Sequence, residues 1–104
     1  MITELSTTNF DAEVLHATEP VLVFFWSQWN GLDRMLMPII NQIATEMAGR
    51  AKVGRINVYD NLNLVYRFNV RSVPILLFFK NGELVDTAYF THKDNIVDRL
   101  KALL

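Results

Sequence analysis

The chain has 104 residues, of which 51% are hydrophobic and 20% charged, and its formal net charge is −1. This apolar content supplies a real core and excludes a disordered protein. The near-neutral charge, without basic runs, excludes nucleic acid or an anionic membrane as the expected partner. A chain of this length typically forms one domain, so we expect a single domain over residues 1-104.

The first half of the chain predicts a helix, a buried strand and a longer helix. Thr8–Ala17 carries apolar residues at roughly helical spacing, with Thr7 or Thr8 as its N-cap. Val21–Trp26 is apolar on both alternating faces, which is typical of a central strand covered on each side. Leu32–Met47 then shows the single apolar face of an amphipathic helix.

The second half predicts further strands and helices in alternation. The expected elements are strands at Lys52–Tyr59 and Val73–Phe79, a short helix at Leu62–Phe68, and a last strand at Glu83–Phe90. Lys80–Gly82 is a tight turn that makes the last two strands a β-hairpin. Thr91–Asp94 forms a capping-box pattern before a closing helix. The apolar face of that helix consists of Ile96, Val97, Leu100, Leu103 and Leu104.

These elements follow one another in the order β-α-β-α-β-α-β-β-α, in which the first strand, at the N-terminus, has the weakest signal. Strands that alternate with helices favour a mixed sheet with helices on both faces. The sequence therefore predicts an α/β protein.

Several short strings along the chain have a familiar order and spacing. They are Val21-Leu22-Val23 with Phe25-Trp26, Trp29 with Gly31, Met35, Pro38-Ile39, Ile56-Asn57-Val58, Val70-Arg71 with Val73-Pro74, Leu76-Leu77, and Phe79-Lys80-Asn81-Gly82-Glu83. Together they resemble thioredoxin from about Thr3 to Leu103. The resemblance implies a thioredoxin fold, a three-layer α/β/α arrangement with a central mixed β-sheet flanked by helices.

The chain departs from the family where the family does its chemistry. The resemblance places Asn30 and Asp33 at the two cysteine positions and Phe24 at the position of a buried acid, and the chain contains no cysteine. Exchange needs a thiolate nucleophile, which neither an amide nor a carboxylate replaces. Leu32 stands where the family has a proline, and Tyr59 where it usually has an aspartate. Such concerted differences favour a natural redox-inactive relative over a laboratory cysteine knockout.

The polar residues of this loop predict structure rather than catalysis. Asn30 is a preferred N-cap, and Asp33 in the first turn complements the helix dipole, although such a helix N-terminus could also accept a small anion. No catalytic residue is expected. His16 and His92 are far apart and lack ligand spacing, so neither a metal nor another cofactor is expected.

The resemblance still implies a surface that binds a partner. In the family, the residue at Trp29 borders an apolar face that docks extended peptide, and Val73-Pro74 resembles the cis-proline segment beside the active loop. The expected partner-binding residues are Trp29, Gly31, Leu32, Met35, Val73 and Pro74. The alternatives are a half-buried Trp29 packed on its own loop and a Pro74 kept only for the fold. Trp26 is expected to be structural, packed against Tyr59.

The leading hypothesis is a non-enzymatic module that binds a protein or peptide partner, with a chaperone-like or assembly role. A second hypothesis makes the same face the self-association surface of a homo-oligomer. A third is enzymatic, either by a thiol-independent route or with thiols that a partner supplies. The stretch Met1–Leu5 has neither a basic leader nor an apolar signal core, so the expected location is cytoplasmic.

Overall fold

The computed structural model describes residues 2–89 and 92–104. Its centre is a five-stranded sheet in the order β1-β3-β2-β4-β5. The strands are β1 (Thr3–Leu5), β2 (Val21–Trp26), β3 (Lys52–Asn57), β4 (Ile75–Lys80) and β5 (Glu83–Ala88). Strands β1, β3 and β2 run parallel, whereas β4 pairs antiparallel with both β2 and β5. The sheet is therefore mixed, and the predicted α/β class is confirmed.

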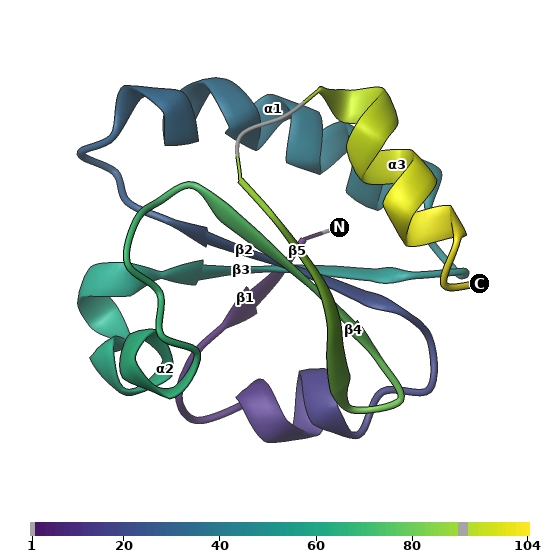
Figure 1. Cartoon of the computed structure of the whole chain (residues 1–104), viewed down its shortest axis with the longest axis horizontal. Coiled ribbons are helices and arrows are strands. Elements are labelled where there is room, and N and C mark those ends of the chain that lie inside the picture. The colour runs from purple at the N-terminus through teal and green to yellow at the C-terminus, as the bar shows by residue number, and fades with distance from the viewer. Residues whose placement is uncertain (1, 90–91) are drawn as a thin grey trace.

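Helices cover both faces of this sheet (Figure 1). They are α1 (Gly31–Glu46), α2 (Leu62–Arg67), α3 (Lys93–Lys101) and the short segments η1 (Asp11–Leu15, π-helical) and η2 (Val58–Asp60, 3-10). α1 and α3 lie together on one face, and η1 and α2 lie on the other (Figure 1). This is the expected three-layer arrangement. None of the described helices has the length and apolar character needed to cross a membrane.

The central strands β2 and β4 divide their side chains between two cores, as the period of two along a strand requires. Leu22 and Phe24 of β2 face α1 and α3, whereas Val23 and Phe25 face η1 and α2. All four side chains are buried. This explains why the sequence of β2 is apolar at every position.

A glycine in β3 allows the edge strand β1 to approach. Gly54 pairs with Thr3, and a Cβ built on Gly54 would lie 2.3 Å from Leu5 Cδ1. Leu5 is buried in the core on the η1 side. Any side chain at position 54 would therefore displace Leu5, which is the main apolar anchor of this short strand.

The predicted helix at Thr8–Ala17 is wrong in extent and in its cap. The helical segment is only η1, and neither Thr7 nor Thr8 caps it. Ser6 begins the preceding turn instead, because its N–H donates to Asn9 Oδ1 at 2.8 Å and its Oγ accepts from Thr8 N at 3.2 Å. This reciprocal pattern is that of a capping box, and local threonines do not reveal it.

Two predicted strands have different ends in the structure. β3 stops at Asn57, whose Oδ1 accepts from Tyr59 N at 3.0 Å and starts η2. β4 begins at Ile75 rather than Val73. The intervening Pro74 has no N–H to give to a sheet, since its nitrogen lies in the ring.

The C-terminal predictions hold only in part. Ile96 and Leu100 are buried and Val97 and Leu103 pack beside them, but Leu104 is exposed beyond the end of α3. The hairpin turn at Lys80–Gly82 is confirmed. Phe90 and Thr91, on which the end of the last strand and the capping box depended, lie outside the described residues. His92 is the N-cap of α3 and makes no side-chain capping hydrogen bond.

Candidate functional site

The loop between β2 and α1 is organised by Ser27, which is buried. Ser27 Oγ accepts a hydrogen bond from Trp29 N at 3.1 Å, and its carbonyl accepts one from Asn30 N at 3.2 Å. Its own N–H donates to Asp33 Oδ2 at 2.8 Å. Trp29 is 75% exposed. The loop therefore holds the indole of Trp29 out in solvent on a hydrogen-bonded turn, and the alternative of a half-buried Trp29 is wrong.

Asn30 both caps α1 and ties it to a distant segment. Its Oδ1 accepts from Leu32 N at 2.8 Å and from Asp33 N at 3.3 Å, which confirms the predicted N-cap. Its Nδ2 donates to the Val73 carbonyl at 3.0 Å, across 43 positions of sequence. The Val73–Pro74 peptide bond is cis. The side-chain amide of Asn30 thus joins the segment that ends in Pro74 to the start of α1.

Asp33, in the first turn of α1, is fully buried. Its Oδ2 has the hydrogen bond from Ser27, but its Oδ1 accepts none from any described residue. Burial raises the pKa of the Asp33 carboxyl above its ordinary value, and the hydrogen bond from Ser27 opposes part of that rise. This raised pKa depends on burial, which no local sequence pattern reveals. Among the described residues the carboxyl makes no ion pair, and its hydrogen bond comes from a backbone N–H.

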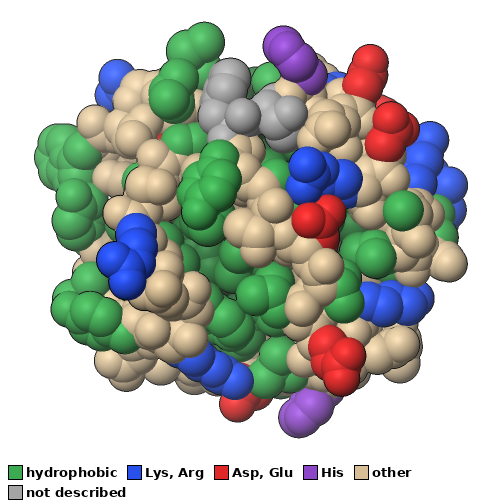
Figure 2. All heavy atoms as spheres, in the orientation of Figure 1, with side chains coloured by type: hydrophobic (Ala, Val, Ile, Leu, Met, Phe, Trp, Pro, Cys, Tyr) green, Lys and Arg blue, Asp and Glu red, His purple; other side chains and the backbone are tan. Residues whose placement is uncertain are grey.

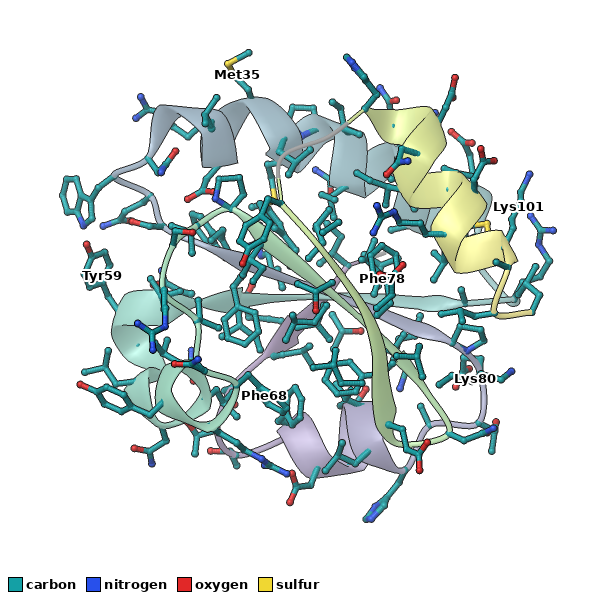
Figure 3. The ribbon with its side chains drawn as sticks, viewed as in Figure 1. Met35, Tyr59, Phe68, Phe78, Lys80 and Lys101 are labelled. Atoms are coloured by element: carbon teal, nitrogen blue, oxygen red, sulfur yellow. The ribbon has the colours of Figure 1, made fainter. Side chains whose placement is uncertain are left out.

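Apolar side chains gather around this loop. Figure 2 shows hydrophobic atoms along the left edge of the view, over the loop before α1 and over α2. Leu32 and Met35, on the first turns of α1, are 45% and 64% exposed. Met35 projects from α1 away from the sheet, whereas Tyr59 lies on the opposite side of the loop (Figure 3). Met35 and Tyr59 therefore face in different directions.

An apolar hollow of about 230 Å³ lies beside the cis-proline segment. Its lining residues are Val58, Tyr59, Leu62, Val65, Val70, Arg71, Ser72 and Val73. Of the six predicted binding residues only Val73 lines it, and Pro74 is buried. Three surface residues of this site were not predicted from the sequence, namely Tyr59, Leu62 and Val70. Because β2 and β3 run parallel, the residues after β3 lie at the same edge of the sheet as the loop after β2, which contacts Val73 through Asn30.

Trp26 is structural, as predicted, but its neighbours differ from the expectation. It packs against the core under α1, and the Arg55 guanidinium lies 5.4 Å from its ring centroid. Tyr59 lines the apolar hollow, which Trp26 does not. Trp26 Nε1 is buried and donates to no described residue.

Residues 2–89 and 92–104 contain no group of three or more His, Cys, Asp or Glu side chains that could hold a metal ion. His16 and His92 are both exposed. The described chain therefore offers its loop, its hollow and its surfaces, rather than a metal centre, as candidate sites.

The fold and the loop together define a class of protein. A mixed sheet in this order, with helices on both faces and α1 starting beside the Val73–Pro74 segment, is the thioredoxin fold. The family model for thioredoxin matches residues 1–102. The chain belongs to the thioredoxin family.

Similar proteins cover most of the chain. A thioredoxin of Rickettsia felis is 38% identical over 99 residues, which are 94% of each chain. A thioredoxin of Pyropia yezoensis is 40% identical over 86 residues, and one of Haemophilus influenzae is 36% identical over 86 residues. Each of these two alignments covers 83% of this chain and 80% of the relative. Because this chain has no cysteine, it cannot by itself perform the thiol–disulfide exchange of thioredoxin.

Proposed function

We propose that this protein is a non-enzymatic member of the thioredoxin family that binds a protein or peptide partner. The docking face consists of Trp29, Gly31, Leu32, Met35 and Val73 together with the apolar hollow, whereas Pro74 is buried and forms no part of its surface. The observation that carries the proposal is the 75% exposure of Trp29 on a hydrogen-bonded loop. A large aromatic side chain left in water is a typical anchor of a binding surface.

The hydrogen bonds that order this loop favour partner binding over a loop that is kept only for the fold. Asn30 joins α1 to the Val73 segment, and Ser27 fixes the turn that carries Trp29. A surface that is ordered before it meets a partner loses less conformational entropy on binding. A chaperone-like or assembly role fits such a surface, because it requires contact without chemistry.

The test compares two leucines of matched exposure. Leu32, on the docking face, is 45% exposed, and Leu84, on the edge strand β5, is 44% exposed. The wild-type protein is cross-linked in a lysate to the proteins that it binds, and these partners are then recovered. We expect Trp29→Asp and Leu32→Asp to lose partners that the wild type recovers. Leu84→Asp should retain them. If the three variants and the wild type retain the same proteins, the docking face has no role in binding and the proposal fails.

Self-association through the same face is the alternative. Trp29, Leu32 and Met35 are exposed hydrophobic side chains that a second copy would cover. Light scattering over a range of protein concentrations separates the two cases. A concentration-dependent mass that Leu32→Asp abolishes supports a homo-oligomer, and a monomer at every concentration removes this alternative.

We propose further that the isolated chain has no disulfide reductase activity. Enzymatic roles with partner-supplied thiols, or without thiols, are the remaining alternative. The check is an insulin-turbidity assay with dithiothreitol, in which an ordinary thioredoxin is the positive control. Reduction above the uncatalysed background by the isolated chain would contradict the proposal.

A further inference from the structure

A second hollow, separate from the docking face, lies where α1 crosses the ends of β2 and β3. It has a volume of about 370 Å³ and is lined by Trp26, Arg34, Met37, Pro38, Asn41 and Arg55. We call these six residues the arginine groove. Four of them stand at intervals of three, four and seven residues along α1 and form one stripe of that helix. The groove shares no lining residue with the apolar hollow.

The arginine groove is positively charged, although the chain as a whole carries −1. Two arginines line it and no acid does. Arg55 Nε donates to Glu4 Oε1 at 2.6 Å, so one guanidinium is neutralised. Arg34 is exposed and makes no ion pair with any described residue. Asp33 beside it is turned to Ser27 and does not line the groove. One positive charge is therefore uncompensated.

Apart from Asn41, the rest of the groove is apolar, and two of its side chains contact Arg55. The Arg55 guanidinium lies over Trp26, 5.4 Å from the ring centroid, and its Nη1 is 3.5 Å from Met37 Sδ. Pro38 adds an apolar wall on α1. A guanidinium stacked in this way retains the planar fork that recognises carboxylates.

We propose that the arginine groove binds a small carboxylate with an apolar body. The single uncompensated charge favours a monoanion over a doubly charged phosphate. Arg34 binds the carboxylate, and the apolar body lies against Met37, Pro38 and the part of Trp26 that Arg55 leaves uncovered. The volume lies at the lower end of the range of about 300–1,000 Å³ for small-ligand pockets, which suits a ligand with one ring.

The buried indole N–H of Trp26 provides a reporter. Because it is sealed in the wall and has no hydrogen-bond partner among the described residues, its NMR resonance responds to small displacements of the groove. Trp29→Phe assigns the two indole resonances. The probe is phenylacetate, with 2-phenylethanol as its neutral counterpart and acetate as its counterpart without a ring. We expect saturable shifts at Trp26, Arg34 and Asn41 with phenylacetate, and at least tenfold weaker binding of the other two compounds.

Charge variants complete the test. Arg34→Gln should weaken phenylacetate binding at least tenfold, whereas Arg50→Gln, at an exposed arginine outside the groove, should leave it unchanged. The NMR spectrum of each variant reports whether it is folded. Equal affinity for 2-phenylethanol, an unchanged affinity in Arg34→Gln, or shifts confined to the apolar hollow would each overturn the proposal. Tighter binding of inorganic phosphate than of phenylacetate would overturn the choice of a monoanion.

Discussion

The chain departs from the thiol site of thioredoxin both in strand β2 and in the loop that follows it, and the two departures differ in kind. In β2, Phe24, where the resemblance implies a buried acid, is fully enclosed in an apolar core. Where the loop enters α1, Asp33 Oδ1 is instead buried without a hydrogen-bond partner among the described residues. An apolar substitution in a strand fills space, whereas a polar substitution in a loop must find hydrogen bonds. The sheet is therefore adapted to a thiol-free site more completely than the loop is.

The largest test of this comparison puts the acid back into the strand. Phe24→Asp removes a buried aromatic ring and adds a carboxylate to the core under α1. The cation paired opposite it on β3 is Arg55, which Glu4 already engages. We expect a loss of at least about 4 kcal/mol in the free energy of unfolding, because large-to-small core substitutions alone cost about 3–5 kcal/mol. Urea denaturation followed by circular dichroism measures it.

Phe24→Leu is the matched control, since it keeps an apolar side chain of similar size. It should cost no more than about 1.5 kcal/mol. A Phe24→Asp protein that is as stable as Phe24→Leu would show that the strand still accommodates the acid, and the contrast with the loop would disappear.

The next largest effect is expected at Asn30, a polar residue of the loop whose side chain does make hydrogen bonds. Asn30→Ala should lower the free energy of unfolding by about 2 kcal/mol, since it removes an N-cap worth about 1 kcal/mol and a hydrogen bond worth about 1 kcal/mol. Asn30→Ser keeps a capping oxygen but is too short to reach the Val73 carbonyl. It should cost about half as much. Thermal or urea denaturation of the two variants separates the cap from the bridge, and equal losses would mean that the bridge contributes nothing.

The difference between these roles also explains what the sequence could predict. The cap of α1 follows from local information, namely an asparagine immediately before an amphipathic pattern. The bridge to Val73 depends on a contact over 43 positions, which no local pattern encodes. The two central strands followed from their apolar runs, since strands buried on both faces have such sequences. The C-terminal end of β3 depended on a side-chain hydrogen bond at Asn57 and was predicted wrongly, at Tyr59.

The exposure of the side chains at the site was predicted less well than the place of the site in the chain. The resemblance located the loop and the cis-proline segment, because short strings at fixed spacing mark them. Exposure depends on tertiary packing, which buries Pro74 and leaves Tyr59 and Leu62 at the surface. The raised pKa of Asp33 belongs to the same class of property, since only the folded chain encloses that carboxyl.

The smallest expected effect tests that enclosed carboxyl. Asp33→Asn keeps an oxygen for Ser27 N and removes the buried charge. Because the folded-state pKa is raised, the native protein holds the Asp33 proton more tightly than the unfolded chain does. That contribution to stability is complete below the unfolded-state pKa of about 3.9 and is lost as the pH rises through the folded-state pKa. We expect the variant to match the wild type near pH 3 and to exceed it by about 1 kcal/mol at pH 8.

The helix dipole stabilises a charged carboxylate near the helix N-terminus and so opposes the effect of burial at Asp33. The control is therefore a carboxylate on which the dipole acts without burial. Both Asp33 and the exposed Asp94 lie in the first turn of a helix, where a negative charge contributes about 0.3–1 kcal/mol. At Asp94 no burial offsets this contribution, so Asp94→Asn should be slightly less stable than the wild type at pH 8. At Asp33 the cost of burying the charge, which the Asn variant removes, is larger than the dipole term, because the carboxyl is fully buried. Opposite signs for the two variants at pH 8 support the unpaired carboxyl of the loop, and the same sign for both would contradict it.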